Sequence, residues 1–258
     1  PQPAPAAGNA KIAVVSLDVA GSGTAGVPAR VGQVDLGGTV PAELVAGDER
    51  GLVATASHSR TLWFIDPATD SVTGTLNLDG RFGSYLYPGE SQPQYMGGVL
   101  VDNDHGKAYL AVWNGIAEVD IAARAVSRVL VAAPPESPGY DPVRRLIFAP
   151  FYSCAAVVGC PQCTAGTGPP PPCASYLAAN GSPVTDGLNV ISLADGAVYT
   201  YRDATPGPAF GTGSSPDAAA VDPVLQVAVV PLENDLDEVF LDLSRAVFSP
   251  LTRSFTAP

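Results

Sequence analysis

The sequence is poor in basic residues and lacks a long apolar run. Lys and Arg number 13 against 25 Asp and Glu, which gives a formal net charge of -12 at pH 7. A negative field of this kind repels phosphate groups, so the composition argues against nucleic acid as a partner. No run of about 18 or more apolar residues occurs, so the sequence predicts no membrane-spanning helix.

Histidine is scarce as well, since only His58 and His105 occur in the chain. A Ser-His-Asp arrangement would need one of them, and no Gly-x-Ser-x-Gly motif accompanies either. His105 lies in a tight turn, which leaves His58 as the one plausible base. No Cys-x-x-Cys-His motif for covalent haem is present. The sequence therefore favours a non-catalytic protein, and we expect no cofactor.

Glycine and proline are abundant, with 27 and 26 residues. Such a composition is typical of many short strands joined by turns and unfavourable for long helices. Residues 97–131 show this pattern clearly, with four short strand candidates separated by tight turns. One of these turns contains Asn114-Gly115, a strong hairpin signal. A single meander of this size cannot bury both faces of its sheet, so it needs neighbours packed against it.

The same layout recurs in four segments of the chain, at about residues 43–80, 97–133, 137–205 and 216–258. An aspartate marks the first turn of each copy, at Asp48, Asp102, Asp141 and Asp222. The end of the third strand carries Asp66, Asp120, Ser192 and Asp242. Four copies of a strand meander predict an all-β fold, a β-propeller built from four-stranded antiparallel blades.

The number of blades is less well defined by the sequence. Residues 11–36 add a further pair of strand candidates before the first full copy. We therefore expect four or five visible blades in a short or incomplete ring, the alternative being that the chain is part of a longer product. Residues 1–10 are rich in proline and alanine and are expected to be a linker that precedes a propeller domain over residues 11–258.

The repeats resemble those of the YVTN-type surface and periplasmic β-propellers, whose repeat is roughly 40 residues long. The residues that carry the resemblance are Val101-Asp102 with Ala108-Tyr109-Leu110-Ala111, Phe64-Ile65-Asp66-Pro67-Ala68-Thr69-Asp70-Ser71-Val72, Val119-Asp120-Ile121 and Val221-Asp222-Pro223. The resemblance covers about residues 43–257 and implies the fold, because members of this family differ in function. The sequence departs from the family in the third copy, which carries an insertion rich in cysteine and proline over residues 153–186.

Antiparallel alternation places the turns between second and third strands at the same end of the blades as the links from one blade to the next. The long connections and many aromatic residues fall at this end. The candidate partner-binding residues there are His58, Tyr85, Tyr87, Tyr95, Trp113 and Tyr152. Loops of varied length on a rigid scaffold are typical of recognition surfaces. The alternative is that these aromatic side chains pack against the insertion and cover it.

The insertion contains all four cysteines: Cys154, Cys160, Cys163 and Cys173. Four cysteines in a loop that cannot form its own core predict two disulfides, for which three connectivities are open. A zinc site and a redox dithiol at Cys160-Pro-Gln-Cys163 are the alternatives. A separate acidic cluster, with Glu233, Asp235 and Asp237, is a weak candidate for binding a metal ion, the alternative being a solvated charged loop.

The first ten residues, PQPAPAAGNA, resemble the mature start of a secreted or lipid-tethered chain from which a signal peptide has been removed, the alternative being a chain trimmed for another reason. We therefore expect an extracellular, cell-surface or periplasmic location. The function expected is that of a non-catalytic propeller that binds or scaffolds a protein or glycan through its looped end. The alternatives are a propeller enzyme or enzyme subunit, either a hydrolase or lactonase or part of a periplasmic dehydrogenase, and a repeat subunit of a surface assembly or filament.

Overall fold

A computed structural model of the chain describes residues 11–16, 29–37, 42, 44–78, 82, 96–112, 115–130, 135, 137–152, 186–201, 216–232, 237–250 and 254–257. The regular elements in these ranges are β-strands and one short 3-10 helix, η3 (Leu243–Arg245). Within the same ranges, no helix has the length and hydrophobicity needed to cross a membrane.

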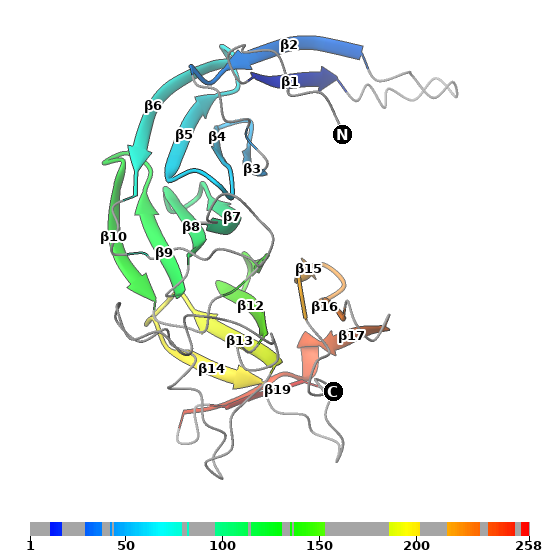
Figure 1. The fold of residues 1–258 in the computed structure, drawn as a ribbon. Helices are drawn as coiled ribbons and strands as arrows, with labels where there is room; N and C mark the ends of the chain where they lie inside the picture. The colour runs from blue at the N-terminus through cyan, green and yellow to red at the C-terminus, as the bar shows by residue number, and fades with distance from the viewer. Residues whose placement is uncertain are drawn as a thin grey trace, which may run out of the picture.

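The described strands form a hairpin followed by four sheets, here called blades 1 to 4 in chain order (Figure 1). The hairpin is β1 (Lys11–Ser16) and β2 (Ala29–Asp35). Blade 1 is β3 (Leu44–Asp48), β4 (Gly51–Thr55), β5 (Thr61–Asp66) and β6 (Ser71–Asn77). Blade 2 is β7 (Met96–Asp102), β8 (Lys107–Val112), β9 (Gly115–Asp120) and β10 (Ala125–Leu130).

Blades 3 and 4 follow the same order. Blade 3 is β11 (Gly139–Asp141), β12 (Leu146–Tyr152), β13 (Asp186–Ser192) and β14 (Val198–Tyr201). Blade 4 is β15 (Ala220–Asp222), β16 (Val227–Leu232) and β17 (Asp237–Asp242). The chain continues through η3 into β18 (Val247–Ser249) and β19 (Ser254–Thr256). Consecutive strands within each blade pair antiparallel, as the turn pattern of the sequence predicts.

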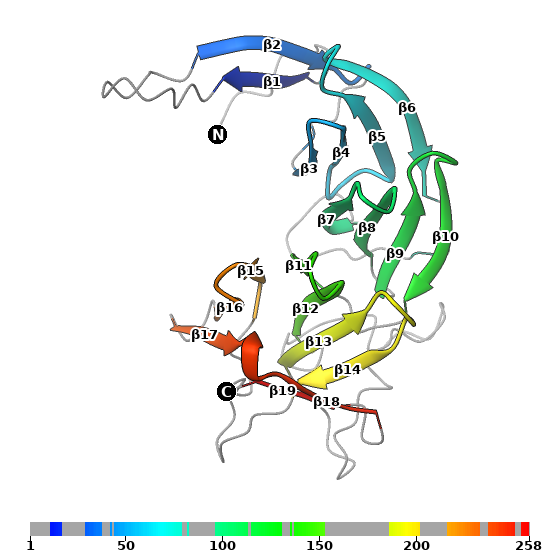
Figure 2. The same cartoon turned by 180° about the vertical axis from the view of Figure 1, so that it is seen from behind.

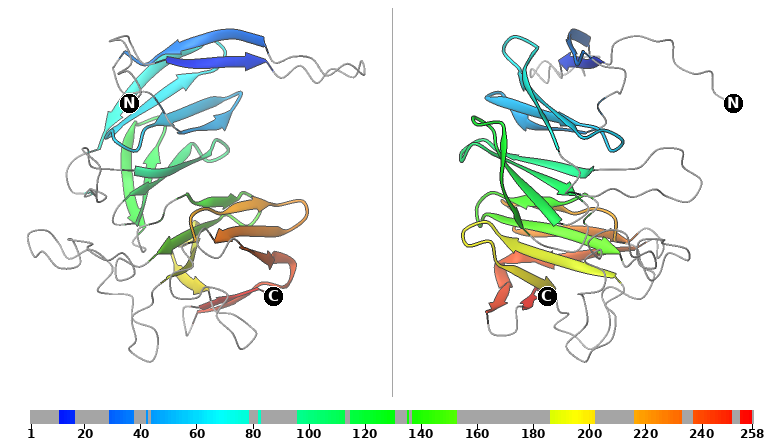
Figure 3. Two further views of the ribbon diagram at one scale, coloured as in Figure 1. Left: turned by 45° about the vertical axis from the view of Figure 1, so that its right-hand side comes forward. Right: turned by 60° about the vertical axis from the view of Figure 1, so that its left-hand side comes forward.

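The four blades follow one another along an arc, with their first strands on its inner side (Figures 1 and 2). Adjacent first strands approach each other, β3 beside β7 and β11 beside β15. The hairpin β1–β2 lies at one end of the arc and blade 4 at the other, and these two ends do not meet (Figure 3). The predicted all-β propeller of antiparallel blades, with an incomplete ring, is therefore confirmed.

The hydrophobic cores lie between successive blades. One core joins blades 1 and 2 through residues such as Phe64 and Leu110. A second joins blades 2 and 3 around Ile116 and Ile147, and a third joins blades 3 and 4 around Val190. Alternation along each strand sends apolar side chains to both faces of the sheet, so each blade is stabilised by burying its faces against its neighbours.

The C-terminal segment departs from the predicted repeat. The sequence predicts that residues 216–258 form one blade, whereas β19 pairs in parallel with β14 and extends blade 3 to six strands. Aromatic packing accounts for this placement. The rings of Phe248 and Phe255 lie 4.9 Å from each other, and Phe248 also lies edge-on to Tyr199 at 4.9 Å. Such pairs favour burial of the hairpin on the outer edge of blade 3.

Candidate functional site

The two ends of the blades differ in construction. The turns between first and second strands, and between third and fourth strands, emerge at one end, called here the turn end. The turns between second and third strands and the links between blades emerge at the other, called the loop end. At the turn end these connections are short, with four residues between β7 and β8, between β11 and β12 and between β15 and β16.

The structure describes only some of the residues that the sequence predicts to form a site. His58 lies in the turn between β4 and β5 at the loop end, and Tyr152 ends β12, where its backbone pairs with Asp186. Asp237 begins β17 and is exposed. The remaining candidates lie outside the described residues: Tyr85, Tyr87, Tyr95, Trp113, Cys154, Cys160, Cys163, Cys173, Glu233 and Asp235. Across the described ranges, no three His, Cys, Asp or Glu side chains converge to suit a metal ion.

The repeated aspartate of each first turn accepts hydrogen bonds from the backbone of its own turn. Asp48 Oδ1 accepts from the amide of Arg50 at 2.9 Å, and Asp102 Oδ1 accepts from the amide of His105 at 3.3 Å. Asp141 Oδ1 accepts from two turn amides at 2.9 and 3.1 Å, and Asp222 Oδ1 from two at 2.9 Å. The recurring residue therefore closes a tight turn, which is a common structural role for aspartate.

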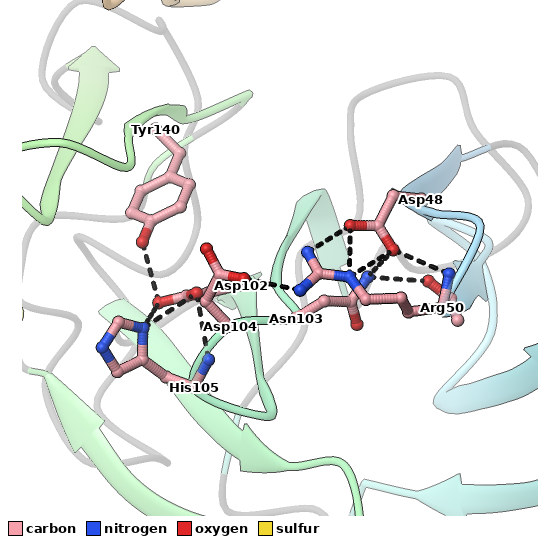
Figure 4. Close-up of polar contacts among 8 residues, drawn as sticks. Asp48, Arg50, Asp102, Asn103, Asp104, His105 and Tyr140 are labelled. Carbon is pink, nitrogen blue, oxygen red and sulfur yellow. Dashed lines mark hydrogen bonds and ion pairs between the residues drawn. The ribbon is translucent and has the colours of Figure 1, made fainter.

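The turn of blade 1 is bonded to the turn of blade 2. Asn103 donates from Nδ2 to Asp48 Oδ1 at 2.7 Å and to the carbonyl of Gly51 at 3.1 Å. Arg50 donates to Asp48 and to Asp104. The side chains of Arg50 and Asn103 converge on the Asp48 carboxylate (Figure 4). The hydrogen bond from Arg50 lowers the pKa of Asp48 from 3.8 to about 2.

A second group joins blade 2 to blade 3. Asp102, only 5% exposed, accepts from the Tyr140 hydroxyl at 2.8 Å and contacts Nδ1 of His105 at 2.8 Å (Figure 4). Burial raises the pKa of Asp102, but the bonds from His105 and Tyr140 outweigh it and hold the pKa below its usual value. Burial and the neighbouring Asp102 carboxylate raise the pKa of Tyr140. Asp102 is therefore ionised at neutral pH and Tyr140 is protonated, as the hydrogen bond between them requires.

The same blade interface buries a further charged group. Glu118 of β9 accepts from Ser127 Oγ at 2.7 Å and from Arg128 Nε at 2.8 Å. Arg128 also donates to the carbonyl of Leu193 in blade 3 at 3.2 Å. A buried carboxylate needs such partners, because an unpaired charge in the interior is costly. The contacts of Glu118 thus stabilise the packing of blade 2 on blade 3.

Blade 3 is bonded to blade 4 through Arg144. Its guanidinium donates to Asp141 of its own turn at 2.9 Å and to the carbonyl of Leu243 at 3.3 Å. It also donates to Gln226 in the first turn of blade 4. The first turns of blades 1, 2 and 3 are therefore each bonded to the next blade along the arc. The recurring aspartate marked the turns in the sequence, but no periodic signal marked partners such as Asn103, Tyr140 and Arg144.

Among solved structures that resemble this chain, two are reported by name, and both likenesses are weak. No protein-family model and no curated protein sequence matches the chain. Hydrazine synthase of Kuenenia stuttgartiensis is 14% identical over 84% of this chain and 68% of that chain, with a TM-score of 0.44. The computationally designed Ika4 protein is 10% identical over 81% of this chain and 96% of that chain, with a TM-score of 0.47. Both TM-scores are too low to carry a functional argument, so the fold assignment rests on strand order and blade cores.

Proposed function

We propose that this protein is an exported, non-catalytic β-propeller that binds or scaffolds a protein or glycan partner through its loop end. The proposal is supported by the contacts that the aspartates of the turn end make. All four repeated aspartates close their own turns, and Asp48 and Asp102 also bind side chains of the next blade. Those carboxylates stabilise the fold, while variable connections gather at the opposite end.

The composition also indicates which kind of partner to expect. A net charge of -12 favours a basic or uncharged partner surface, because like charges across an interface oppose binding. Aromatic side chains are enriched at binding surfaces, and the sequence predicts that Trp113 and the tyrosines named above lie at the loop end. A rigid scaffold with aromatic loops suits both glycan stacking and protein docking.

The test uses a paired substitution at the loop end, Trp113→Ala with Tyr152→Ala. The control is Val143→Ala, in the first turn of blade 3 at the turn end, where Val143 is 73% exposed. The labelled chain is applied to a glycan array and, separately, to immobilised secreted and cell-surface proteins. We expect the paired change to weaken capture about tenfold or more and the control to leave it unchanged. Capture that survives the paired change, or is lost in the control, contradicts the proposal.

Hydrolysis is a second candidate function, favoured by the Asp102–His105 pair and not by His58, the base that the sequence indicated. The buried carboxylate holds Nδ1 of a histidine whose side chain is 45% exposed, so Nε2 is the nitrogen available to act as a general base. The test is turnover of p-nitrophenyl acetate and a panel of lactones by the wild type and by His105→Gln. Equal rates for the two proteins exclude His105 as the base.

A further inference from the structure

Buried polar atoms without a hydrogen bond gather at the interface between blades 2 and 3. Among the described residues, the buried side-chain atoms that have no partner belong to Tyr109, Arg145 and Asn189. Tyr109 lies in the core that joins these two blades, and Arg145 of blade 3 lies beside Asp102 of blade 2. Asn189 pairs with Ala149 of the same core, so its side chain is on the face of blade 3 that packs against blade 2. The described parts of the other two blade interfaces contain no such atom.

The first group of these atoms lies near the turn end. The rings of Tyr109 and Tyr140 are neighbours, with 6.3 Å between their centroids. Arg145 Nε lies 4.0 Å from Asp102 Oδ2, which is too far for a direct hydrogen bond. Burial, followed by the carboxylates of Glu118 and Asp102, raises the pKa of Tyr109 to about 12, and Arg145 opposes this rise. The Tyr109 hydroxyl is therefore protonated and lies near two carboxylates and a guanidinium, yet it is bonded to none of them.

The charges around this group determine which ligand could bond to it. An anion would lie beside the buried carboxylates of Asp102 and Glu118, and a cation would lie beside the guanidinium of Arg145, so both are disfavoured. Arg145 Nε needs an acceptor, whereas Asp102 Oδ2 needs a donor, so the ligand must be able to accept and to donate. A water molecule is uncharged and does both. With hydrogen bonds of about 2.9 Å, one water spans two atoms that are 4.0 Å apart.

Asn189 forms the second group, deeper in the same interface. Its side chain is fully buried, and neither Oδ1 nor Nδ2 is bonded to any described residue. The core residues beside it in blade 3, such as Ile147, Ala149 and Ile191, have apolar side chains. A buried amide without partners is costly and rare in folded proteins. Because the amide contains both donors and an acceptor in uncharged surroundings, a water molecule suits it as well.

We propose that two internal water molecules are bound between blades 2 and 3. The first bridges Arg145 Nε, Asp102 Oδ2 and the Tyr109 hydroxyl, and the second bonds to the amide of Asn189. Internal waters typically form about three hydrogen bonds with buried polar groups that otherwise lack them. The first water joins two side chains of blade 2 to one of blade 3, so it adds to the direct bonds that hold these blades together. This inference does not depend on the proposed function.

The first test is the direction in which Tyr109→Phe changes stability. If the hydroxyl bonds to a water, its removal destabilises the protein, whereas removal of an unbonded buried hydroxyl stabilises it. The matched control is Tyr201→Phe, because the Tyr201 hydroxyl donates to the carbonyl of Ala257 at 3.2 Å. We expect each variant to raise the unfolding equilibrium constant in urea about fivefold. A Tyr109→Phe variant that is as stable as the wild type, or more stable, would overturn the first water.

The second test detects the waters themselves, and it excludes a direct bond from Arg145 to Tyr109 as the cause of the first result. Oxygen-17 relaxation dispersion measures internal waters that exchange slowly with the solvent. Asn189→Leu leaves a water there without polar partners, so it should remove the contribution of one such water. Tyr109→Phe should shorten the residence time of the other, and Tyr201→Phe should change neither. Dispersion that is unchanged in both Asn189→Leu and Tyr109→Phe would overturn the proposal.

A crystal structure of the wild type gives the positions directly. It should show one water within about 3.2 Å of Arg145 Nε, Asp102 Oδ2 and the Tyr109 hydroxyl, and another within that distance of the Asn189 amide. Arg145 bonded directly to Tyr109, or an ion in place of the first water, would contradict the first site. A direct protein partner for the Asn189 amide would contradict the second.

Discussion

Replacing Asp102 should destabilise the protein far more than replacing Asp222, its equivalent in blade 4. Asp102 accepts from Tyr140 and His105 as well as from its turn, whereas the bonds described for Asp222 come from the amides of Val224 and Leu225. A hydrogen bond to a charged group contributes about 1.5–3 kcal/mol, and a donor buried without an acceptor costs about 1–3 kcal/mol. The side chain of Asp102 is almost fully buried, so solvent screening is small.

We therefore expect Asp102→Ala to lower the free energy of unfolding by about 3–4 kcal/mol and Asp222→Ala to lower it by about 1 kcal/mol. Urea unfolding followed by circular dichroism at neutral pH, at one protein concentration, measures both. The matched pair controls for the loss of a turn-closing aspartate, so the difference reports the contacts of Asp102 with Tyr140, His105 and Arg145, whose Nε lies 4.0 Å from Asp102 Oδ2. Equal losses in the two variants would refute the conclusion that Asp102 links blade 2 to blade 3.

Two further predictions concern the turns. The carboxyl of Asp48 should titrate with a midpoint of about 2 by NMR, and Arg50→Gln should raise the midpoint toward 3.8. Because the folded pKa is depressed, this contribution to stability is present above pH 3.8 and is lost as the pH falls toward 2. A wild-type midpoint near 3.8 would contradict the Arg50 contact. Gly106 has φ +62°, and no atom lies within 4 Å of the position that a Cβ would take there. Gly106→Ala should therefore lower the free energy of unfolding by about 1 kcal/mol through backbone strain alone, and Gly106→Asn by less, as measured by urea unfolding. An alanine variant as stable as the wild type would show that this turn is not left-handed.

The repeats could be predicted from the sequence because two local signals coincide in each copy. Apolar alternation sets the strands, and an aspartate at a constant position sets the first turn. Neither signal identifies what the aspartate binds in the next blade. Asn103 follows the aspartate of its own turn, whereas Tyr140 precedes the aspartate of the next one, so the partners do not share a repeat position.

The C-terminal segment could not be placed from the sequence for a related reason. Repeat length alone assigns residues 247–256 to the outer edge of blade 4, but Phe255 is fully buried against blade 3. Contacts between aromatic rings distant in the sequence outweigh the local periodicity there. The predicted loop-end site stays a prediction, because only His58, the backbone of Tyr152 and Asp237 fall within the described residues.

A double-mutant cycle between Asp102 and Tyr140 most directly tests whether the turn end holds successive blades together. Asp102→Asn, Tyr140→Phe and the combined variant are compared with the wild type by urea unfolding. Residues that share a hydrogen bond across an interface should show a coupling energy of about 1–2 kcal/mol. A coupling energy near zero, with losses that simply add, would contradict a contact between blade 2 and blade 3 at this position.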